Sequence, residues 1–311
     1  MIATVTLNPA IDIRYSIPAF QLDNVNRVSS VDKTAGGKGL NVSRVLSQLG
    51  AKVTCTGFLG GKSGEWIAEQ FTNWNLINCF VPIQGETRFC LAIESMEGHT
   101  EILEQGPEII ENEKEEFLQN FDSVLESNDY IIISGSLPGG LEADFYRQLA
   151  EMAKHKGKYV LLDSSGESLA QGIHGKPFLI KPNKDEFCQL IGKGSLSLEE
   201  MIWHSQIICQ NGVEYVLLSL GKSGALLISR SQVLRADIPI LTNVHQVGSG
   251  DSMLAGFTYA HSQGYSIEEV LKWACACGMS NAASERTGWI DLLQVQNFLN
   301  LIKVKELTGS V

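Results

Sequence analysis

A glycine-rich turn that runs directly into an aspartate and an apolar helix is the strongest chemical signal in the chain. The segment Val247–Gly256 reads V-G-S-G-D-S-M-L-A-G. Small residues at Gly248, Ser249 and Gly250 leave backbone N–H groups free to converge on an anion, and the dipole of the following helix adds to their effect. Asp251 is expected in the first helical turn, where a carboxylate stays ionised and accepts a proton. Because an aspartate there is also a common helix cap, the turn alone does not establish catalysis.

A second glycine-rich segment opens another predicted helix. Gly36–Asn41 reads G-G-K-G-L-N. Glycines before a helix let a ligand approach the backbone closely, and the helix end favours anions. Lys38 adds a positive charge, and Asn41 adds a neutral donor and acceptor. The segment is not a dinucleotide fingerprint, because the third glycine is replaced by Val42, which argues against an NAD-dependent oxidoreductase.

Two other segments resemble P-loops but fail at a required glycine. Gly57–Ser63 needs a glycine where the chain has Thr56, and Gly221–Ser223 needs one where it has Val216. Any phosphate-binding helix in this protein is therefore of another kind.

Lys181–Glu186 reads K-P-N-K-D-E and allows two interpretations. Asn183 and Glu186 have the spacing of a capping box, which the residues alone favour. Alternatively, Glu186 lies near Mg²⁺, with water between them. Ser134–Pro138 and Ser219–Gly224 end predicted strands, at the sheet edge where α/β proteins bind ligands.

Strand-like and helix-like runs alternate along the chain. Short apolar runs predict strands over Ile2–Leu7, Val53–Phe58, Tyr130–Ser134, Tyr159–Asp163, Phe178–Ile180 and Val216–Leu220. Amphipathic spacing predicts helices over Val42–Leu49, Leu141–His155 and Ser197–Gln210. The alternation predicts an α/β fold with a mainly parallel sheet covered on both faces.

Two segments, residues 12–33 and residues 86–106, interrupt this rhythm with alternating strand patterns and no helix. They predict a small antiparallel sheet inserted into a single domain that spans residues 1–311. A half-covered sheet must bury its apolar face, so we expect a lid, a dimer contact, or both.

The composition excludes several classes of protein. With 44% hydrophobic and 19% charged residues, the chain has an ordinary globular profile. Its formal net charge of −11 argues against nucleic-acid binding, which depends on Lys and Arg. No apolar run reaches the ~18–20 residues of a membrane span, and no targeting segment is evident, so we expect a cytoplasmic protein without a membrane partner. The seven cysteines are expected to be reduced core thiols.

Taken together, these motifs resemble the ribokinase-like (PfkB) family of carbohydrate kinases, which includes the phosphofructokinases without a P-loop. The resemblance runs in order over Thr6–Asp12, Gly36–Asn41, Gly57–Gly64, Thr87–Arg88, Ile133–Pro138, Lys181–Glu186, Ser219–Gly224 and Gly248–Asp251. The last motif is the family's specific C-terminal signature, with Ser249 where alanine is usual. Thr100–Ile109 is most similar to tagatose-6-phosphate kinases, whereas Gly36–Asn41 is shared with fructose-1-phosphate kinases and does not separate the two.

The resemblance implies a role for each matching residue. Asp251 would be the catalytic base, and the N–H groups of Gly248, Ser249 and Gly250 would bind the migrating phosphoryl group. Substrate binding is assigned to Asp12, Arg27, Gly36, Gly37, Lys38, Asn41, Arg88, Ser136 and Asp251. Among these, Lys38 and Arg88 would bind the phosphate already on the sugar, and Arg27 would come from the second subunit of a homodimer formed through the lid.

The resemblance also implies the cofactors ATP and Mg²⁺. The ATP site is assigned to Asn183, Ser219, Gly221, Gly224, Gly248, Gly250 and Asn281. Glu186 would support Mg²⁺. The expected activity is ATP-dependent phosphorylation of a ketohexose phosphate. Tagatose 6-phosphate is the first expectation, fructose 1-phosphate is the alternative, and a non-catalytic sugar-phosphate sensor is a third reading that the intact Asp251 motif disfavours.

Overall fold

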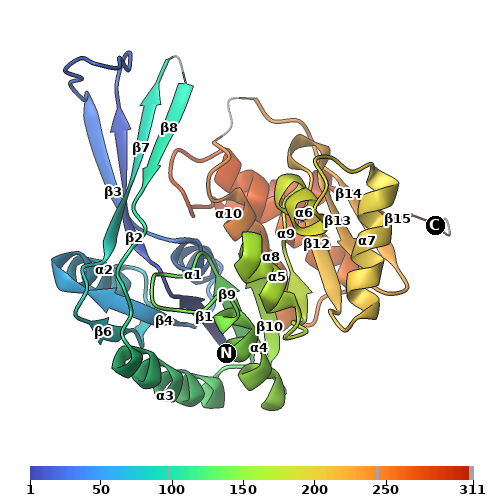
Figure 1. The fold of residues 1–311 in the computed structure, drawn as a ribbon. Helices are drawn as coiled ribbons and strands as arrows, with labels where there is room; N and C mark the ends of the chain where they lie inside the picture. Colours follow the sequence, from blue (N-terminus) through green and yellow to red (C-terminus); the bar gives the residue numbers. More distant parts are fainter. Residues whose placement is uncertain (97, 243–244, 308–311) are drawn as a thin grey trace.

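The computed structural model describes residues 1–96, 98–242 and 245–307, which form two β-sheets with helices around the larger one (Figure 1). The described strands of the larger sheet follow the order β15-β14-β13-β12-β11-β10-β9-β1-β4-β5, and β6 also pairs with β4. These strands are β1 (Ile2–Thr6), β4 (Val53–Gly60), β5 (Ile77–Asn78), β6 (Val81–Ile83), β9 (Tyr130–Ser134), β10 (Tyr159–Asp163), β11 (Leu179–Ile180), β12 (Tyr215–Ser219), β13 (Ala225–Ile228), β14 (Val233–Asp237) and β15 (Lys303–Glu306).

The centre of the larger sheet is parallel, as the sequence predicted. All pairings from β5 across to β12 are parallel, and only β12 to β15 pair in an antiparallel manner. The carboxyl ends of the parallel strands therefore meet at one edge, which is the usual ligand-binding edge of such a sheet.

Helices cover both faces of this sheet, and each face has its own apolar core. Along β9, Ile131 and Ile133 belong to one core and Ile132 to the other, because successive strand residues point to opposite faces. One side holds α1 (Lys38–Gln48), α2 (Gly61–Asn73), α8 (Ser249–Ser262), α9 (Ile267–Ala282) and α10 (Leu292–Leu301). The other holds α3 (Glu111–Ser127), α4 (Phe145–His155), α5 (Gly166–Ile173), α6 (Lys184–Ile191) and α7 (Leu198–Gln210).

Most predicted elements are found close to their expected bounds. β9 and β10 match their predictions, and α7 begins after the N-cap Ser197, whose side chain accepts from Glu200 N–H. α1 ends before Gly50, whose φ is 84°. α4 starts at Phe145 rather than Leu141, so that prediction was too long at its N-terminal end.

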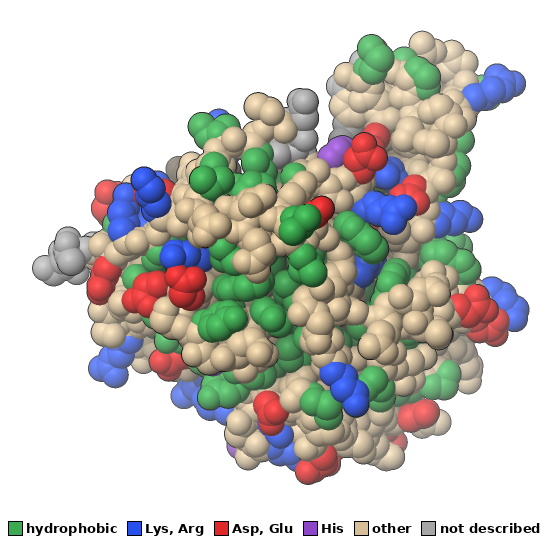
Figure 2. Space-filling model, turned by 180° about the vertical axis from the view of Figure 1, so that it is seen from behind, with side chains coloured by type: hydrophobic (Ala, Val, Ile, Leu, Met, Phe, Trp, Pro, Cys, Tyr) green, Lys and Arg blue, Asp and Glu red, His purple; other side chains and the backbone are tan. Residues whose placement is uncertain are grey.

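The smaller sheet has the order β3-β2-β7-β8 and projects from the body of the molecule (Figures 1 and 2). Its strands are β2 (Ala10–Ser16), β3 (Ser30–Gly36), β7 (Arg88–Ser95) and β8 (Gly98–Leu103). The expectation of an antiparallel sheet was wrong at its centre, because β2 and β7 are parallel. Both strands enter from the same base, β2 soon after β1 and β7 soon after β6, and β1, β4 and β6 run parallel in the larger sheet.

The register gives the smaller sheet one polar and one apolar face. Asp12 pairs with Cys90 on the polar face, to which Arg88 also belongs. Ile13, Leu91 and Ile102 lie side by side on the apolar face. Ile13 is buried, whereas Ile102 is 52% exposed, so the apolar face is covered only in part. Hydrophobic side chains are visible on the projecting sheet in Figure 2.

Two further expectations concern the whole chain. All seven cysteines are free, most of them buried, as expected of reduced core thiols. Within the described part of the chain, no helix combines the length and the apolar character that crossing a membrane requires.

Candidate active site

The turn at Gly248 opens α8 and sets the position of Asp251. Gly248 has φ 80°, and a Cβ atom there would approach Thr287 Cγ2 to 2.7 Å, so the turn requires glycine. Asp251 lies in the first turn of α8, as predicted. The N–H of Ser249 donates to Gln246 O at 3.2 Å. The N–H groups of Gly250 and Asp251 come next, and groups at this position of a helix lack an acceptor within it.

Asp251 connects α8 with the glycine-rich loop that opens α1. Asn41 Nδ2 donates to Asp251 Oδ2 at 2.8 Å. Asp251 is 6% exposed, so it is nearly buried below the half-buried turn without being sealed. Burial and the negative charge of Asp163 raise the pKa of Asp251 to about 6, against the opposing effects of Lys38, Asn41 and Lys181. A carboxyl with this pKa is ionised at neutral pH and is suited to accept a proton.

Lys38 occupies the space between two carboxylates on the opposite side of the site. Its Nζ lies 3.2 Å from Asp163 Oδ1 and 3.5 Å from Glu186 Oε1. Asp163 also pairs with Lys181, whose Nζ is 3.0 Å from Asp163 Oδ2. The charge of Asp163 is the main cause of the raised pKa of Lys38, which keeps that ammonium charged. Burial opposes ionisation of Asp163, but Lys181 and Lys38 outweigh it and lower its pKa.

Sequence reasoning missed Asp163 and Lys181 as site residues. Both are almost fully buried, at 1% and 4% exposure, and a Cβ atom on Gly250 would come within 2.9 Å of Lys181 Nζ. Lys181 therefore lies against the glycine turn of α8. The available signal was the position of Asp163 at the carboxyl end of a correctly predicted strand.

Arg88 connects the base of the smaller sheet with the end of β1. It donates to Glu104 O at 2.7 Å and to Asn8 O at 3.0 Å. The Asn8 amide in turn donates to Gln105 O at 2.9 Å and to Ser136 Oγ at 3.3 Å. Arg88 is thus already engaged with backbone carbonyls, and its predicted contact with a sugar phosphate stays a prediction.

Asp12 lies on the polar face of the smaller sheet, directly over the first glycine of the α1 loop. A Cβ atom on Gly36 would come within 2.0 Å of Asp12 Oδ2. Burial raises the pKa of Asp12 to about 6, while Arg44 and then Arg88 oppose that rise. Gly37, which follows Gly36, is the N-cap of α1 and has a φ of 103°.

The predicted nucleotide-binding residues follow β11 and β12. Asn183 pairs with Ser219 in an isolated bridge. Gly221 begins a short 3₁₀ turn and Gly224 follows it, both with positive φ values. The capping box is confirmed: Asn183 Oδ1 accepts from Glu186 N–H at 2.9 Å, and Glu186 Oε2 accepts from Asn183 N–H at 2.9 Å. Glu186 Oε1 faces Lys38, so this carboxylate takes part in both the helix cap and the candidate site.

Asn281 and Arg27 are the remaining predicted residues. The buried amide of Asn281 donates to Val247 O at 2.9 Å and to Ser249 Oγ at 3.3 Å, and it accepts from Gly288 N–H at 2.7 Å. It therefore braces the turn at Gly248, and its predicted place near adenine is untested. Arg27 is exposed on the loop between β2 and β3, so a role for it depends on a second subunit.

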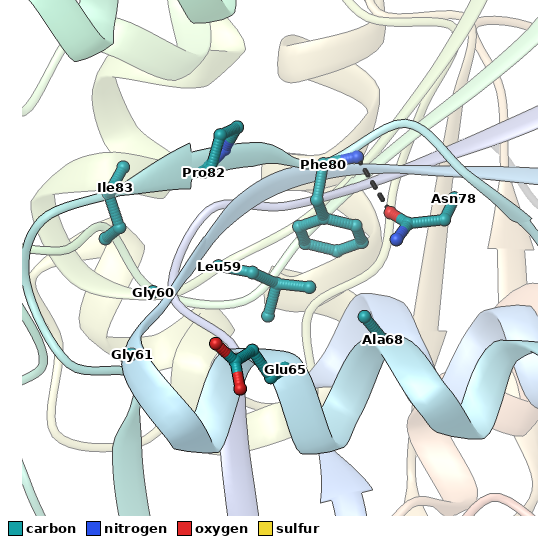
Figure 3. Close-up of a pocket in the computed structure, with 10 residues that line it drawn as sticks. Leu59, Gly60, Gly61, Glu65, Ala68, Asn78, Phe80, Pro82 and Ile83 are labelled. Carbon is teal, nitrogen blue, oxygen red and sulfur yellow. Dashed lines mark hydrogen bonds between the residues drawn. The ribbon is translucent and has the colours of Figure 1, made fainter.

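A surface pocket elsewhere does not carry this chemistry. It lies between the N-terminal part of α2 and strands β4 and β6, with Leu59, Phe80 and Ile83 on its walls (Figure 3). Glu65 and Asn78 are the polar side chains shown there. None of its lining residues belongs to the predicted site.

Comparisons with known proteins show the family of the chain. The model of the pfkB family of carbohydrate kinases matches residues 5–289. A proposed phosphofructokinase from Staphylococcus aureus is 32% identical, with all of both chains covered and a TM-score of 0.85. Phosphofructokinase-2 from Escherichia coli, solved with potassium, is 27% identical over 96% of this chain and 98% of its own, with a TM-score of 0.89.

The Escherichia coli protein has also been solved with fructose 6-phosphate and as a tetrameric inhibited form. A proposed 1-phosphofructokinase from Thermotoga maritima shares the fold, with a TM-score of 0.90 over 99% of this chain and 100% of its own at 24% identity. The chain belongs to the pfkB family of carbohydrate kinases, which transfer phosphate to sugars or sugar phosphates.

Proposed function

We propose that the protein transfers the γ-phosphoryl group of ATP to a hydroxyl group of tagatose 6-phosphate, giving tagatose 1,6-bisphosphate. The observation that carries the proposal is the hydrogen bond between Asn41 and Asp251. It places a carboxylate with a pKa of about 6 where the loop of α1 and the N-terminus of α8 meet. A proton acceptor beside an anion-binding turn is the arrangement that phosphoryl transfer to an alcohol requires.

Asp251 accepts the proton of the attacking hydroxyl group in this proposal. The transition state is loose and carries its charge on peripheral oxygens, so alignment and charge stabilisation dominate catalysis. The N–H groups of Gly250 and Asp251 in the first turn of α8 would face that charge, whereas Ser249 N–H already donates to Gln246 O. Lys181 lies against Gly250. General-base assistance contributes about 10²–10⁴-fold.

The donor set also fits Mg²⁺, which neutralises charge on the phosphate oxygens when it is bound. Glu186 keeps one carboxylate oxygen away from its capping contact, and its side chain is 17% exposed. Asp163 lies behind the same lysine, fully enclosed. Since Mg²⁺ retains several waters, a carboxylate that reaches it through water is sufficient.

A phosphorylated sugar is favoured over a neutral one by the surrounding cations. We assign Lys38 and Arg88 to the phosphate on the sugar, as the family resemblance implies. Both would have to turn towards it, because Lys38 now pairs with two carboxylates and Arg88 donates to two backbone carbonyls. The preference for tagatose 6-phosphate rests on Thr100–Ile109, which includes the backbone that Arg88 contacts at Glu104. Fructose 1-phosphate is the alternative, because the α1 loop suits it equally.

The test is a substrate panel at fixed MgATP with ADP release as the readout. Tagatose 6-phosphate, fructose 1-phosphate, fructose 6-phosphate and free hexoses are compared by kcat/KM. We expect tagatose 6-phosphate to rank first and free hexoses last. A higher kcat/KM for fructose 1-phosphate than for tagatose 6-phosphate would support the alternative substrate. Sugar-phosphate binding without ADP release would replace the kinase with a sensor.

We further propose that the smaller sheet is a lid and a dimer contact. Its polar face carries Asp12 and Arg88, so closure of that face over the sugar would exclude water. Its apolar face has exposed positions such as Ile102 that a second subunit would cover. The whole chain then acts as one kinase domain with an inserted lid.

A further inference from the structure

Arg44 is a buried cation that the proposed reaction does not yet use. It lies on α1, one turn beyond Asn41, and is 3% exposed. Its Nη2 donates to Ala35 O and its Nη1 to Thr287 O, both at 2.5 Å. The guanidinium lies over the ring of Trp74, 4.5 Å from its centroid. Its Nε is buried and has no hydrogen-bond partner among the described residues.

The two carbonyl acceptors belong to the two halves of the candidate site. Ala35 immediately precedes Gly36, the glycine beneath the Asp12 carboxylate. Thr287 packs behind the turn of α8, because its Cγ2 is the atom nearest to a Cβ built on Gly248.

The segment around Thr287 is tied to that turn by a side chain. Gly288 N–H donates to Asn281 Oδ1 at 2.7 Å, and Asn281 Nδ2 donates to Val247 O at 2.9 Å. One guanidinium therefore bridges, through backbone, the loop under the sugar and the turn under the phosphoryl group.

We propose that Arg44 is a positioning residue, which fixes the α1 loop against the α8 turn and directs a permanent positive charge at Asp12. The inference rests on the proposed kinase function. A small displacement of the sugar hydroxyl from the phosphoryl donor lowers the reaction rate strongly. The bridge formed by Arg44 therefore affects turnover as well as stability.

The charges around Asp12 support this assignment. Arg44 is the strongest of the charges that lower the pKa of Asp12, ahead of Arg88, while Asp251 and Glu101 raise it. The Cys90 thiol lies beside Asp12 in the register of the sheet. Burial lowers the pKa of Arg44 to about 10, so the guanidinium is still charged at neutral pH. The other charges that act on Asp251 are those of Asp163, Lys38 and Lys181.

Two substitutions separate the bridge from the charge. Arg44→Met removes both, whereas Arg44→Lys keeps a charge but loses the planar fork whose two nitrogens bond the two carbonyls. We measure kcat/KM for the sugar phosphate from pH 5.5 to 8.5 at saturating MgATP, together with the KM for ATP. Arg286→Met is the matched control, since Arg286 also lies over a tryptophan ring but is exposed.

We expect Arg44→Met to lower kcat/KM for the sugar phosphate by about 10-fold or more at pH 7. The acidic limb of its kcat/KM profile should move to higher pH by about half a unit or more, because Asp12 loses the positive charge that most lowers its pKa. Arg44→Lys should keep the wild-type acid limb and lose rate, with the KM for ATP unchanged. Arg286→Met should match the wild type.

If the wild type is active and the acidic limb of the kcat/KM profile is unshifted in Arg44→Met, the inference is overturned and the proposed function stands. A wild type that releases no ADP with any sugar phosphate would overturn the proposed function itself. If Arg44→Met does not fold, Arg44→Lys decides: wild-type kcat/KM overturns the inference, and a loss confined to the sugar phosphate supports it.

Discussion

Asp251, which is buried, and Asp12, which is partly buried, are two carboxyls of one site with similar acidities. Burial raises the pKa of each to about 6, and the charge of Asp251 is one of the causes for Asp12. Interacting groups titrate as a pair, so one acid limb would report both of them. We predict that kcat/KM falls as the pH drops through about 6, because protonation removes the base and an acceptor for the sugar. A pH–rate profile that stays flat down to pH 5 would contradict this assignment.

Asp251→Asn tests the base directly. The amide retains an acceptor for Asn41 but cannot take a proton, so we expect kcat to fall by about 10²-fold or more. ATP binding, measured by calorimetry, should persist. The control is Glu268→Gln, an exposed acid in the first turn of α9, which should leave kcat unchanged. Turnover near the wild-type rate in Asp251→Asn would remove Asp251 from this role.

The same variant should be more stable at alkaline pH. A folded-state pKa raised from 3.8 to about 6 gives stability that is complete below pH 3.8 and is lost as the pH rises through about 6. The asparagine has no charge to desolvate, so Asp251→Asn should melt at a higher temperature than the wild type at pH 8. A lower melting temperature would show that the ionised carboxylate stabilises the fold.

The positions and contacts of site residues were predictable from sequence where their partners are close along the chain. The first-turn position of Asp251 and the capping box of Asn183 and Glu186 follow from local spacing, and the structure has both. The partner of Lys38 was not predictable, because Asp163 lies 125 residues away and only the folded sheet brings them together. The contacts of Arg44 were not predictable, because both its acceptors are backbone carbonyls, which leave no mark in the sequence, and that of Thr287 lies 243 residues away.

At the scale of elements, the close approach of β2 to the α1 loop requires a residue without a side chain at position 36. Gly36→Ala would force the Asp12 carboxylate away, because the added Cβ lies 2.0 Å from its Oδ2. We expect the KM for the sugar phosphate to rise by about 10-fold or more while the KM for ATP is unchanged. Gly194→Ala is the matched control, since a Cβ there meets no atom within 4 Å. Equal changes in both KM values would mean that Gly36 does not serve the sugar.

The carboxyl ends of β10 and β11 bring one buried acid between two lysines. Asp163→Asn would leave Lys181, which is 4% exposed, without its counter-charge. We expect a loss of about 3–5 kcal/mol in the free energy of unfolding, measured with urea. Asp129→Asn is the control, since that exposed partner of the N-terminus should cost at most about 1 kcal/mol. A loss no larger than that of the control would show that the lysines find other partners.

Elements were predicted well where the pattern was strongly periodic. The strands β9 and β10 are continuous apolar runs buried on both faces, and such runs are distinctive. The antiparallel strands β13 to β15 were not predicted, because they are only 4, 5 and 4 residues long and three helices separate β15 from β14 along the chain. The parallel pairing of β2 with β7 depends on where both strands leave the larger sheet, and a local pattern does not contain that information.

At the scale of the whole molecule, the smaller sheet has an apolar face that the chain itself covers only in part. Its edge strands β3 and β8 carry Val31 at 49% exposure and Ile102 at 52%. In the part of the chain that the structure describes, no helix packs along the outer half of this sheet (Figure 1). Exposed apolar faces with open edges favour pairing with another chain. We predict that the wild type is a dimer in sedimentation velocity and that Val31→Asp combined with Ile102→Asp makes it monomeric.

The monomeric variant should also lose affinity for the sugar phosphate but not for ATP. Arg27 is exposed on the same sheet's loop, and its predicted contact with the phosphate comes from the second subunit. Leu293→Asp is the control, because Leu293 is 76% exposed on α10, which is not part of the smaller sheet, and its change should alter neither mass nor KM. A double variant that still sediments as a dimer would place the interface elsewhere. A monomer with an unchanged KM for the sugar phosphate would instead show that each subunit binds its phosphate with Lys38 and Arg88 alone.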